Sequence, residues 1–256
     1  ANLTARDSGF ITLDQMLTRI AATVTTLERL ERHRGHFYNW YDTQSLLPLA
    51  PRYISTVDSG NLVAQLMTLR MALLALPAEA PFSPHWCLGL ADLLALVRES
   101  LPAGAHLPAL DRADKLVLAA CADMPVSAPR LQAALETFEQ AARELLAAVE
   151  AALSGDAARN DTDATQDSGE ALRWARSLVA QCEAGRDELA AFGGLALPLG
   201  PDPSPAALAA ADQAPLPALG VLASLGIGQS RAYLGCVYFK RKDEAIQFDS
   251  LQQLRT

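Results

Sequence analysis

Apolar residues recur every three or four positions over most of this chain, which is the period of an amphipathic α-helix. Thr12 and Gln15 have the spacing of a capping box at the start of the first such stretch, and Gly35 is suited to end it. No strand pattern of any length precedes Leu234, where LGCVYF is ambiguous. The fold class predicted is all-α, with helices over 12–33, 59–76, 85–101, 111–122, 127–153, 169–192 and 218–225.

The connections between these segments differ in character. Pro48 and Pro51 exclude regular helix after the first segment. Residues 154–168 carry aspartates and almost no apolar side chains, so we expect a mobile loop that joins two long helices, the first capped by Ser127, into an antiparallel hairpin over 127–192. A linker rich in Pro, Gly and Ala follows over 193–217.

The densest chemistry lies in residues 34–62, RGHFYNWYDTQSLLPLAPRYISTVDSGNL, which hold five of the fifteen aromatic residues. Asn39, Asp42, Arg52 and Asp58 stand among the rings. Flat apolar faces beside hydrogen-bonding groups suit a sugar ligand. The same rings equally suit packing of the loop onto helices, and Asp58 equally suits a cap for a helix that begins near Ser59.

Composition excludes several functional classes. The 21 basic and 29 acidic residues give a net charge of −8, which argues against a nucleic-acid partner. The four cysteines lie far apart in apolar helical contexts, which favours buried thiols in a reducing compartment. His33 and His36 alone make no convincing metal site, and no motif points to a cofactor.

Charged residues such as Arg70 and Arg98 interrupt the longest apolar stretches, so we expect no membrane span within the chain. There is no signal peptide at the start, and the chain begins at Ala1 without a methionine. We therefore expect it to be a piece of a longer protein.

Three motifs carry a family resemblance: LERLERHRGH, then GHFYNWYD, then PLAPRYISTVDSGNL with the helix after it. Together they resemble the central, glycosidase-like region of the cyclic β-1,2-glucan synthases. ALRWARSLVAQC and the proline-rich connection to LASLG resemble the same family more loosely. The resemblance is specific over residues 1–76 and weaker to about residue 228.

The resemblance implies an (α/α)6 barrel that closes linear β-1,2-glucan into rings by transglycosylation. It also implies that glucan and the remainder of the synthase polypeptide are the partners, on the cytoplasmic side of the inner membrane. The residues expected to line or support the glucan cleft are Tyr38, Trp40, Tyr41, Asp42, Arg52, Asp58 and Asn61. Asp42 and Asp58 are the carboxylates in matching motifs, and neither is assigned as acid or nucleophile.

The departures from the family decide what to expect of the chain alone. The segment resembling SIGYRV and the acidic residues sought near it are absent, and the sequence diverges from about Ile227. We expect the start of a barrel over 1–76, a helical insertion over 77–192, a linker with a short helix over 193–228, and a divergent tail over 229–256. About six substantial helices make half a barrel, so we expect no catalysis.

Two other functional classes stay open. The chain is a non-enzymatic helical interaction module if its hairpin, or the flank that a half barrel leaves uncovered, binds a partner. A complete small helical enzyme is the third possibility, and it lacks a recognisable constellation of catalytic residues.

Overall fold

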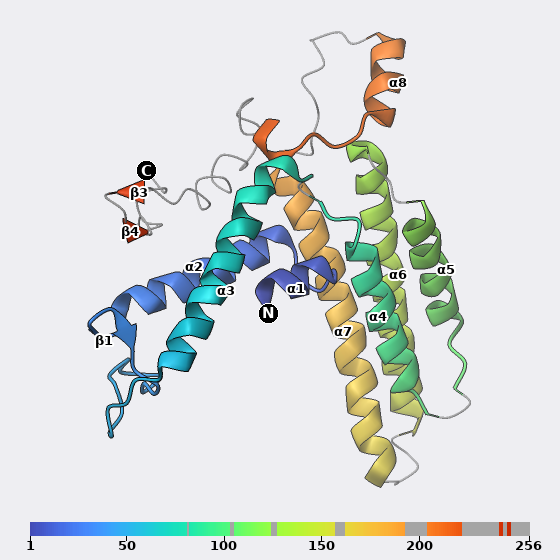
Figure 1. Cartoon of the computed structure of the whole chain (residues 1–256). Coiled ribbons are helices and arrows are strands. Elements are labelled where there is room, and N and C mark those ends of the chain that lie inside the picture. The colour runs from blue at the N-terminus through green and yellow to red at the C-terminus, as the bar shows by residue number, and fades with distance from the viewer. Residues whose placement is uncertain are drawn as a thin grey trace.

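The chain is described by a computed structural model that covers residues 1–80, 82–102, 105–123, 127–156, 162–192, 204–221, 241–242 and 245–246. It is mostly helical, as the sequence predicts (Figure 1). Its helices are α1 (Asn2–Asp7), α2 (Leu13–Arg29), α3 (Thr56–Ala75), α4 (Trp86–Glu99), α5 (Pro108–Ala122), α6 (Ala128–Asp156), α7 (Thr162–Ala191) and α8 (Pro205–Gln213), with a 3-10 turn, η1, at Leu76–Ala78. Its strands are antiparallel pairs of two residues each, β1 (Arg32–His33) with β2 (His36–Phe37) and β3 (Arg241–Lys242) with β4 (Ala245–Ile246).

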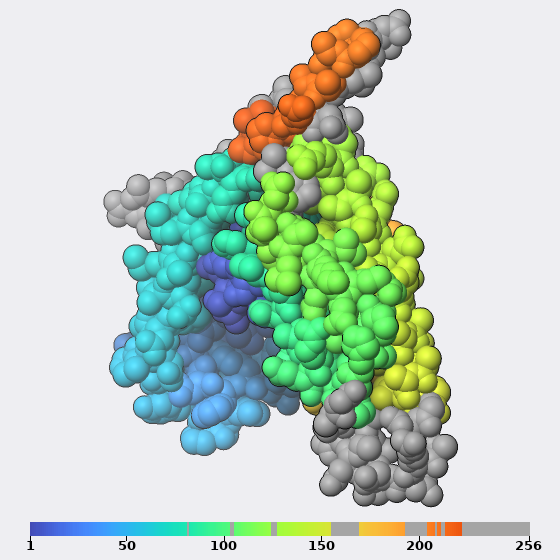
Figure 2. Space-filling model, turned by 90° about the vertical axis from the view of Figure 1, so that its right-hand side faces the viewer, coloured from blue at the N-terminus to red at the C-terminus, as the bar shows by residue number. Residues whose placement is uncertain are grey.

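The four helices α4 to α7 form the main bundle of the molecule (Figures 1 and 2). Helix α7 packs along both α4 and α6, and α5 packs on α4 and α6. The periodic face of α6 predicted from the sequence is the face that is buried, with Leu131, Leu135, Phe138, Leu145 and Val149 all in the core. Burial of one apolar stripe on each helix is what holds such a bundle together.

The N-terminal segment is attached to this bundle through polar contacts as well as apolar ones. The Gln181 side chain on α7 donates a hydrogen bond of 2.7 Å to the Gly9 carbonyl. Glu188, also on α7, accepts one of 2.9 Å from the Asp14 backbone N–H at the first turn of α2. The predicted capping box of Thr12 and Gln15 is present at the same end of α2. The start of α2 is therefore fixed at its cap and against α7.

Beyond this attachment, α2 and α3 lead away from the bundle (Figure 1). We call residues 21–72 the arm: they comprise the rest of α2, the connecting loop and α3 up to Ala72. None of the arm residues is buried. Leu73 and Leu76, at the opposite end of the α3 segment, are each 2% exposed and anchor that end in the core.

Helix α3 has two apolar faces, and only one of them is in contact with the rest of the chain. Leu62, Leu66 and Leu69 are partly buried on the inner face. On the opposite face, Met67 and Met71 are 61% and 62% exposed, beside exposed Val63 and Leu74. A surface helix ordinarily turns polar residues outward, so this second stripe is unusual.

The same helix bears on the expectation that the chain holds no membrane span. Thr56–Ala78 is long and apolar enough, by length and composition, to cross a membrane, although only 11% of its apolar window is buried in the chain. Among the described residues it is the single segment that passes this test. Arg70 does not lower the mean hydropathy of the helix enough to exclude it, as the sequence had suggested.

Several predicted boundaries are wrong. Helix α2 ends at Arg29 rather than His33, because Leu30 is extended and the chain enters the β1–β2 hairpin. Gly35, at φ 87°, lies with Arg34 in the tight turn of that hairpin rather than at a helix end. Helix α7 begins at Thr162, seven residues before the predicted Gly169. Helix α8 occupies part of the predicted linker, and the ambiguous LGCVYF segment lies outside the described residues.

Two predicted details of side chains are also wrong. Ser127 precedes α6 as expected, but its hydroxyl has no hydrogen-bond partner among the described residues, so it is no side-chain cap. Cys87 and Cys182 are buried thiols, whereas Cys121 is exposed. Cys236 lies outside the described residues.

Candidate functional site

All the predicted site residues lie in the arm, in the α2–α3 loop and the first turns of α3 (Figure 1). The loop stands at the far end of the arm from the core, so its shape depends on its own hydrogen bonds. An antiparallel bridge between Tyr41 and Pro48 closes its outer turn. The Asp42 N–H donates to the Leu47 carbonyl at 2.9 Å, and the Leu49 N–H donates to Trp40 at 3.0 Å.

Asn39 fastens this loop to the start of α3. Its backbone N–H donates to the Tyr53 carbonyl at 2.9 Å, and its side-chain oxygen accepts from the Ser55 N–H at 3.0 Å. Its amide nitrogen donates to Oδ2 of Asp58 at 3.4 Å. Asn39 stands among the rings in the sequence and is not one of the predicted site residues. The signal was an amide between two aromatic rings, a place where packing alone needs no polar group.

Asp58 is not the cap of α3. Ser55 holds that position, and its hydroxyl accepts a hydrogen bond of 3.1 Å from the Asp58 N–H. Asp58 is the third residue of the helix, where its negative charge lies next to the positive end of the helix dipole. Its carboxylate is thereby held at the rim of the loop beside Asn39, and Asn61 follows on the exposed surface of the helix.

Tyr38, Tyr41 and Arg52 contact one another and Glu31, which follows α2 in the chain. The Tyr41 hydroxyl accepts from the Tyr38 N–H at 2.8 Å and donates to the Glu31 carbonyl at 2.7 Å. The two rings meet edge to face with their centroids 6.3 Å apart. Arg52 lies over the Tyr38 ring, 5.6 Å from its centroid, and pairs with Glu31 at 3.0 Å. Through these contacts the three residues stabilise the conformation of the loop.

Asp42 is committed to the loop as well. One of its oxygens accepts hydrogen bonds from the Ser45 backbone N–H, the Ser45 hydroxyl and the Gln44 backbone N–H, at 2.6, 2.8 and 3.1 Å. These bonds lower the pKa of Asp42, the Ser45 backbone bond most of all. A carboxyl group held ionised in this way is a poor general acid at neutral pH.

Two aromatic rings remain open to solvent. Trp40 is 64% exposed and Tyr53 is 59% exposed. Tyr53 is one of the five rings in residues 34–62 and is not among the predicted site residues. The structure thus separates the predicted set into supports, which are Tyr38, Tyr41, Asp42 and Arg52, and accessible groups, which are Trp40, Asp58 and Asn61. The accessible groups are able to stack on and hydrogen-bond to a ligand, and they do not form a pair of carboxylates arranged for proton transfer.

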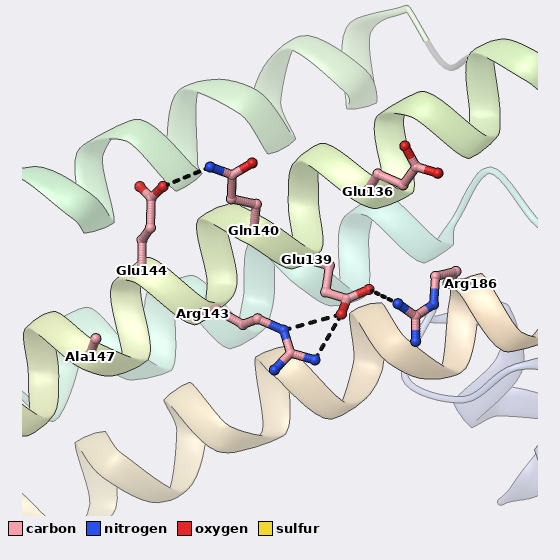
Figure 3. Close-up of a pocket in the computed structure, with 7 residues that line it drawn as sticks. All are labelled: Glu136, Glu139, Gln140, Arg143, Glu144, Ala147 and Arg186. Atoms are coloured by element: carbon pink, nitrogen blue, oxygen red, sulfur yellow. Dashed lines mark hydrogen bonds and ion pairs between the residues drawn. The ribbon is translucent and has the colours of Figure 1, made fainter.

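A second surface feature lies on α6 and α7, where a shallow depression of about 600 Å³ is lined mainly by charged side chains (Figure 3). Glu139, which is 8% exposed, accepts hydrogen bonds from Arg143 at 2.8 and 3.1 Å and pairs with Arg186 at 2.7 Å. Arg143 also pairs with Glu183 at 2.6 Å. These charges neutralise one another between the two helices, so the depression is better explained as an interhelical ion-pair network than as a ligand site.

The described residues contain no group of three or more His, Cys, Asp or Glu side chains placed to hold a metal ion. Glu188 is the carboxyl group with the largest shift among them: burial raises its pKa to about 7, against hydrogen bonds from the Asp14 and Leu13 backbone and the charge of Arg6, which lower it. Glu188 is a buried residue of α7 that contacts the start of α2, far from the α2–α3 loop in the chain. Its environment is that of a structural contact between helices.

Comparison with known proteins relates part of this chain to a glucan synthase. No family model matches the chain. The cyclic beta-(1,2)-glucan synthase NdvB of Rhizobium meliloti (strain 1021) is 33% identical over 190 residues, which are 71% of this chain and 6% of that protein. The chain is therefore related to this synthase and spans only a small part of its length.

Proposed function

We propose that this chain, related to a cyclic β-1,2-glucan synthase, forms part of the glucan-binding barrel of such an enzyme. The observation that carries the proposal is the exposed pair of rings, Trp40 and Tyr53, in the loop where Asn39 contacts Asp58. Sugars bind proteins by stacking on such rings while hydroxyls pair with carboxylates and amides. The relationship to a glucan synthase supports β-1,2-glucan as the ligand.

In this proposal Trp40 supplies a stacking face, and Asp58 and Asn61 supply hydrogen bonds to glucan hydroxyls. Tyr38, Tyr41, Asp42 and Arg52 keep the loop in shape through their contacts within it and with Glu31. The remainder of the synthase polypeptide, at the cytoplasmic side of the inner membrane, would complete an (α/α)6 barrel around the arm. The chain alone would bind weakly and would not close or redistribute glucan chains.

Calorimetric titration of the chain with linear β-1,2-glucan tests the binding. We expect weak binding that the Trp40→Ala change lowers about tenfold, because one stacking face is lost. Leu47→Ala is the matched control, since Leu47 is 62% exposed in the same loop and offers no ring. Equal affinity of the Trp40 variant, or equal binding of an α-1,4-glucan, would reject this assignment of the loop.

Catalysis is tested separately, by incubating the chain with linear β-1,2-glucan and following chain length by mass spectrometry. We expect an unchanged distribution of chain lengths. The Asp42 carboxylate is hydrogen-bonded within its own turn, and the contact described for the Asp58 carboxylate is with the Asn39 amide and not with a second carboxylate. Redistribution of chain lengths would show that the chain is an active transglycosylase.

A specific observation also supports the second function, a helical interaction module. The apolar face of α6, one of the two helices of the hairpin that we expected to bind a partner, is buried within the bundle. Among the described residues, an uncovered apolar stripe lies instead on α3, formed by Val63, Met67, Met71 and Leu74. Light scattering over a range of concentrations tests it. If the stripe drives association, Met67→Gln with Met71→Gln would reduce the apparent mass, whereas a monomer at all concentrations would reject self-association through α3.

A further inference from the structure

Two cysteines lie in contact where α4 and α5 pack together. Cys87 is in the first turn of α4, and Cys121 is in the last turn of α5. Because a short connection makes these helices neighbours, the beginning of one meets the end of the other (Figure 1). The two thiols are close enough for a side-chain hydrogen bond.

The two thiols differ in their access to solvent. Cys87 is 0% exposed, whereas Cys121 is exposed at the surface. A buried thiol alone is inert towards reagents in solution, and an exposed thiol alone stops at a mixed disulfide. A surface thiol in contact with a buried one provides both parts of an intramolecular disulfide: a sulfur that meets the oxidant and a sulfur that displaces it.

We propose that Cys87 and Cys121 form an oxidation site that closes to a disulfide and joins α4 to α5. The oxidant is a low-molecular-weight disulfide such as oxidised glutathione. The Cys121 thiolate attacks one sulfur of the reagent, so that a protein–glutathione disulfide forms and one glutathione thiolate leaves. The Cys87 thiolate then attacks the Cys121 sulfur, and the second glutathione leaves as a thiolate. The two protein thiols lose two protons and two electrons, and one reagent disulfide is reduced to two thiols.

The second step sets the rate of closure. Burial, together with the neighbouring Cys121, raises the pKa of Cys87 to about 12, so its thiolate is scarce at neutral pH. Since the thiolate is the attacking form, we expect closure to accelerate about tenfold for each pH unit between pH 7 and 9. The mixed disulfide on Cys121 should accumulate first and decay as the intramolecular bond forms.

The experiment treats the folded full chain with oxidised glutathione at several pH values, alkylates the remaining thiols, and maps the disulfides by peptide mass spectrometry. A peptide pair that joins Cys87 to Cys121 is the expected result. The oxidised chain should also unfold at a temperature about 5 to 15 °C higher than the reduced chain, because the disulfide lowers the conformational entropy of the unfolded state. A glutathione adduct on Cys121 alone, a bond from Cys121 to Cys236, or no modification would each overturn the proposal.

Two single variants separate the roles of the cysteines. Cys87→Ser should stop at the mixed disulfide on Cys121, and its level should then no longer decay with time. Cys182→Ser is the matched control, because Cys182 is also a buried thiol in the core but lies on α7. The Cys182→Ser variant should form the Cys87–Cys121 disulfide at the same rate as the unmodified chain. Closure that depends equally on Cys182 would contradict the pairing.

Discussion

The α4–α7 bundle and the arm are both built from alanine- and leucine-rich helices, yet they differ in how much apolar surface they cover. In the bundle, Leu94, Leu135 and Leu145 are each 0% exposed. In the arm no residue is buried, and α3 presents its second apolar stripe to solvent. The candidate sugar site lies wholly in the arm. The part of the chain that carries stability is therefore separate from the part that carries the proposed function.

The difference also shows in how each region uses its charged side chains. Bundle helices are joined by ion pairs such as those of Glu139 with Arg186 and of Arg143 with Glu183. The arm uses its polar groups within the loop and at the start of α3, where Asn39, Asp42 and Ser55 satisfy backbone groups. A loop that is shaped by hydrogen bonds keeps its form without a core, and this leaves the Trp40 and Tyr53 rings open to solvent.

The largest expected effect comes from matched truncations of one buried and one exposed apolar side chain. Leu145→Ala in the bundle should lower the free energy of unfolding by about 3 kcal/mol, because it removes packed methyl groups and leaves a cavity. Met67→Ala on α3 should change it by less than about 0.5 kcal/mol, since Met67 is mostly exposed. Urea unfolding measures both, and similar losses would mean that the α3 stripe is covered in solution.

Glu188 gives the next largest effect, through pH. Its pKa is raised from 4.5 to about 7 in the folded chain, so the folded state binds the proton more tightly than the unfolded state. Its contribution to stability is fully present below about pH 4.5 and is lost as pH rises through 7. Glu188→Gln, which keeps an oxygen for the Asp14 N–H, should therefore be more stable than the unmodified chain at pH 8, by at most about 3 kcal/mol.

The measurement is urea unfolding of both proteins at pH 5 and pH 8. The stability difference between them should be small at pH 5 and should favour the variant at pH 8. Asp187→Asn is the control, because the adjacent Asp187 side chain is 75% exposed. A Gln variant that is less stable at both pH values would show that the ionised carboxylate holds α2 to α7.

The smallest effect comes from the two helix caps. Thr12→Ala removes the cap of α2 beside the core, and Ser55→Ala removes the cap of α3 in the arm. Each change should cost about 1 kcal/mol where the cap is made. The Thr12 change should lower the midpoint of global unfolding. The Ser55 change should mainly speed hydrogen exchange of the first-turn amides of α3, by about fivefold. A global loss in both variants would mean that the arm unfolds together with the bundle.

Much of the fold was predictable because the apolar period was regular. The buried face of α6 and the capping box of Thr12 follow from spacing alone. The boundaries were less predictable, since Leu30 ends α2 in an extended conformation that no single residue type dictates, and α7 begins at Thr162, seven residues before the predicted Gly169. Helix α3 has apolar residues on two faces, and tertiary packing decides which of the two finds a partner within the chain.

For the candidate site, the sequence alone identified the loop, its rings and the resemblance to glucan synthases, because residue types and their spacing are local properties. Only the tertiary structure decided that Asp42 and Tyr41 are fixed inside the loop, that Asn39 holds the Asp58 side chain, and that Trp40 and Tyr53 stay open to solvent. The physical reason is that a hydrogen bond or an exposed ring depends on which distant groups come near, and the order of residues does not contain that information directly.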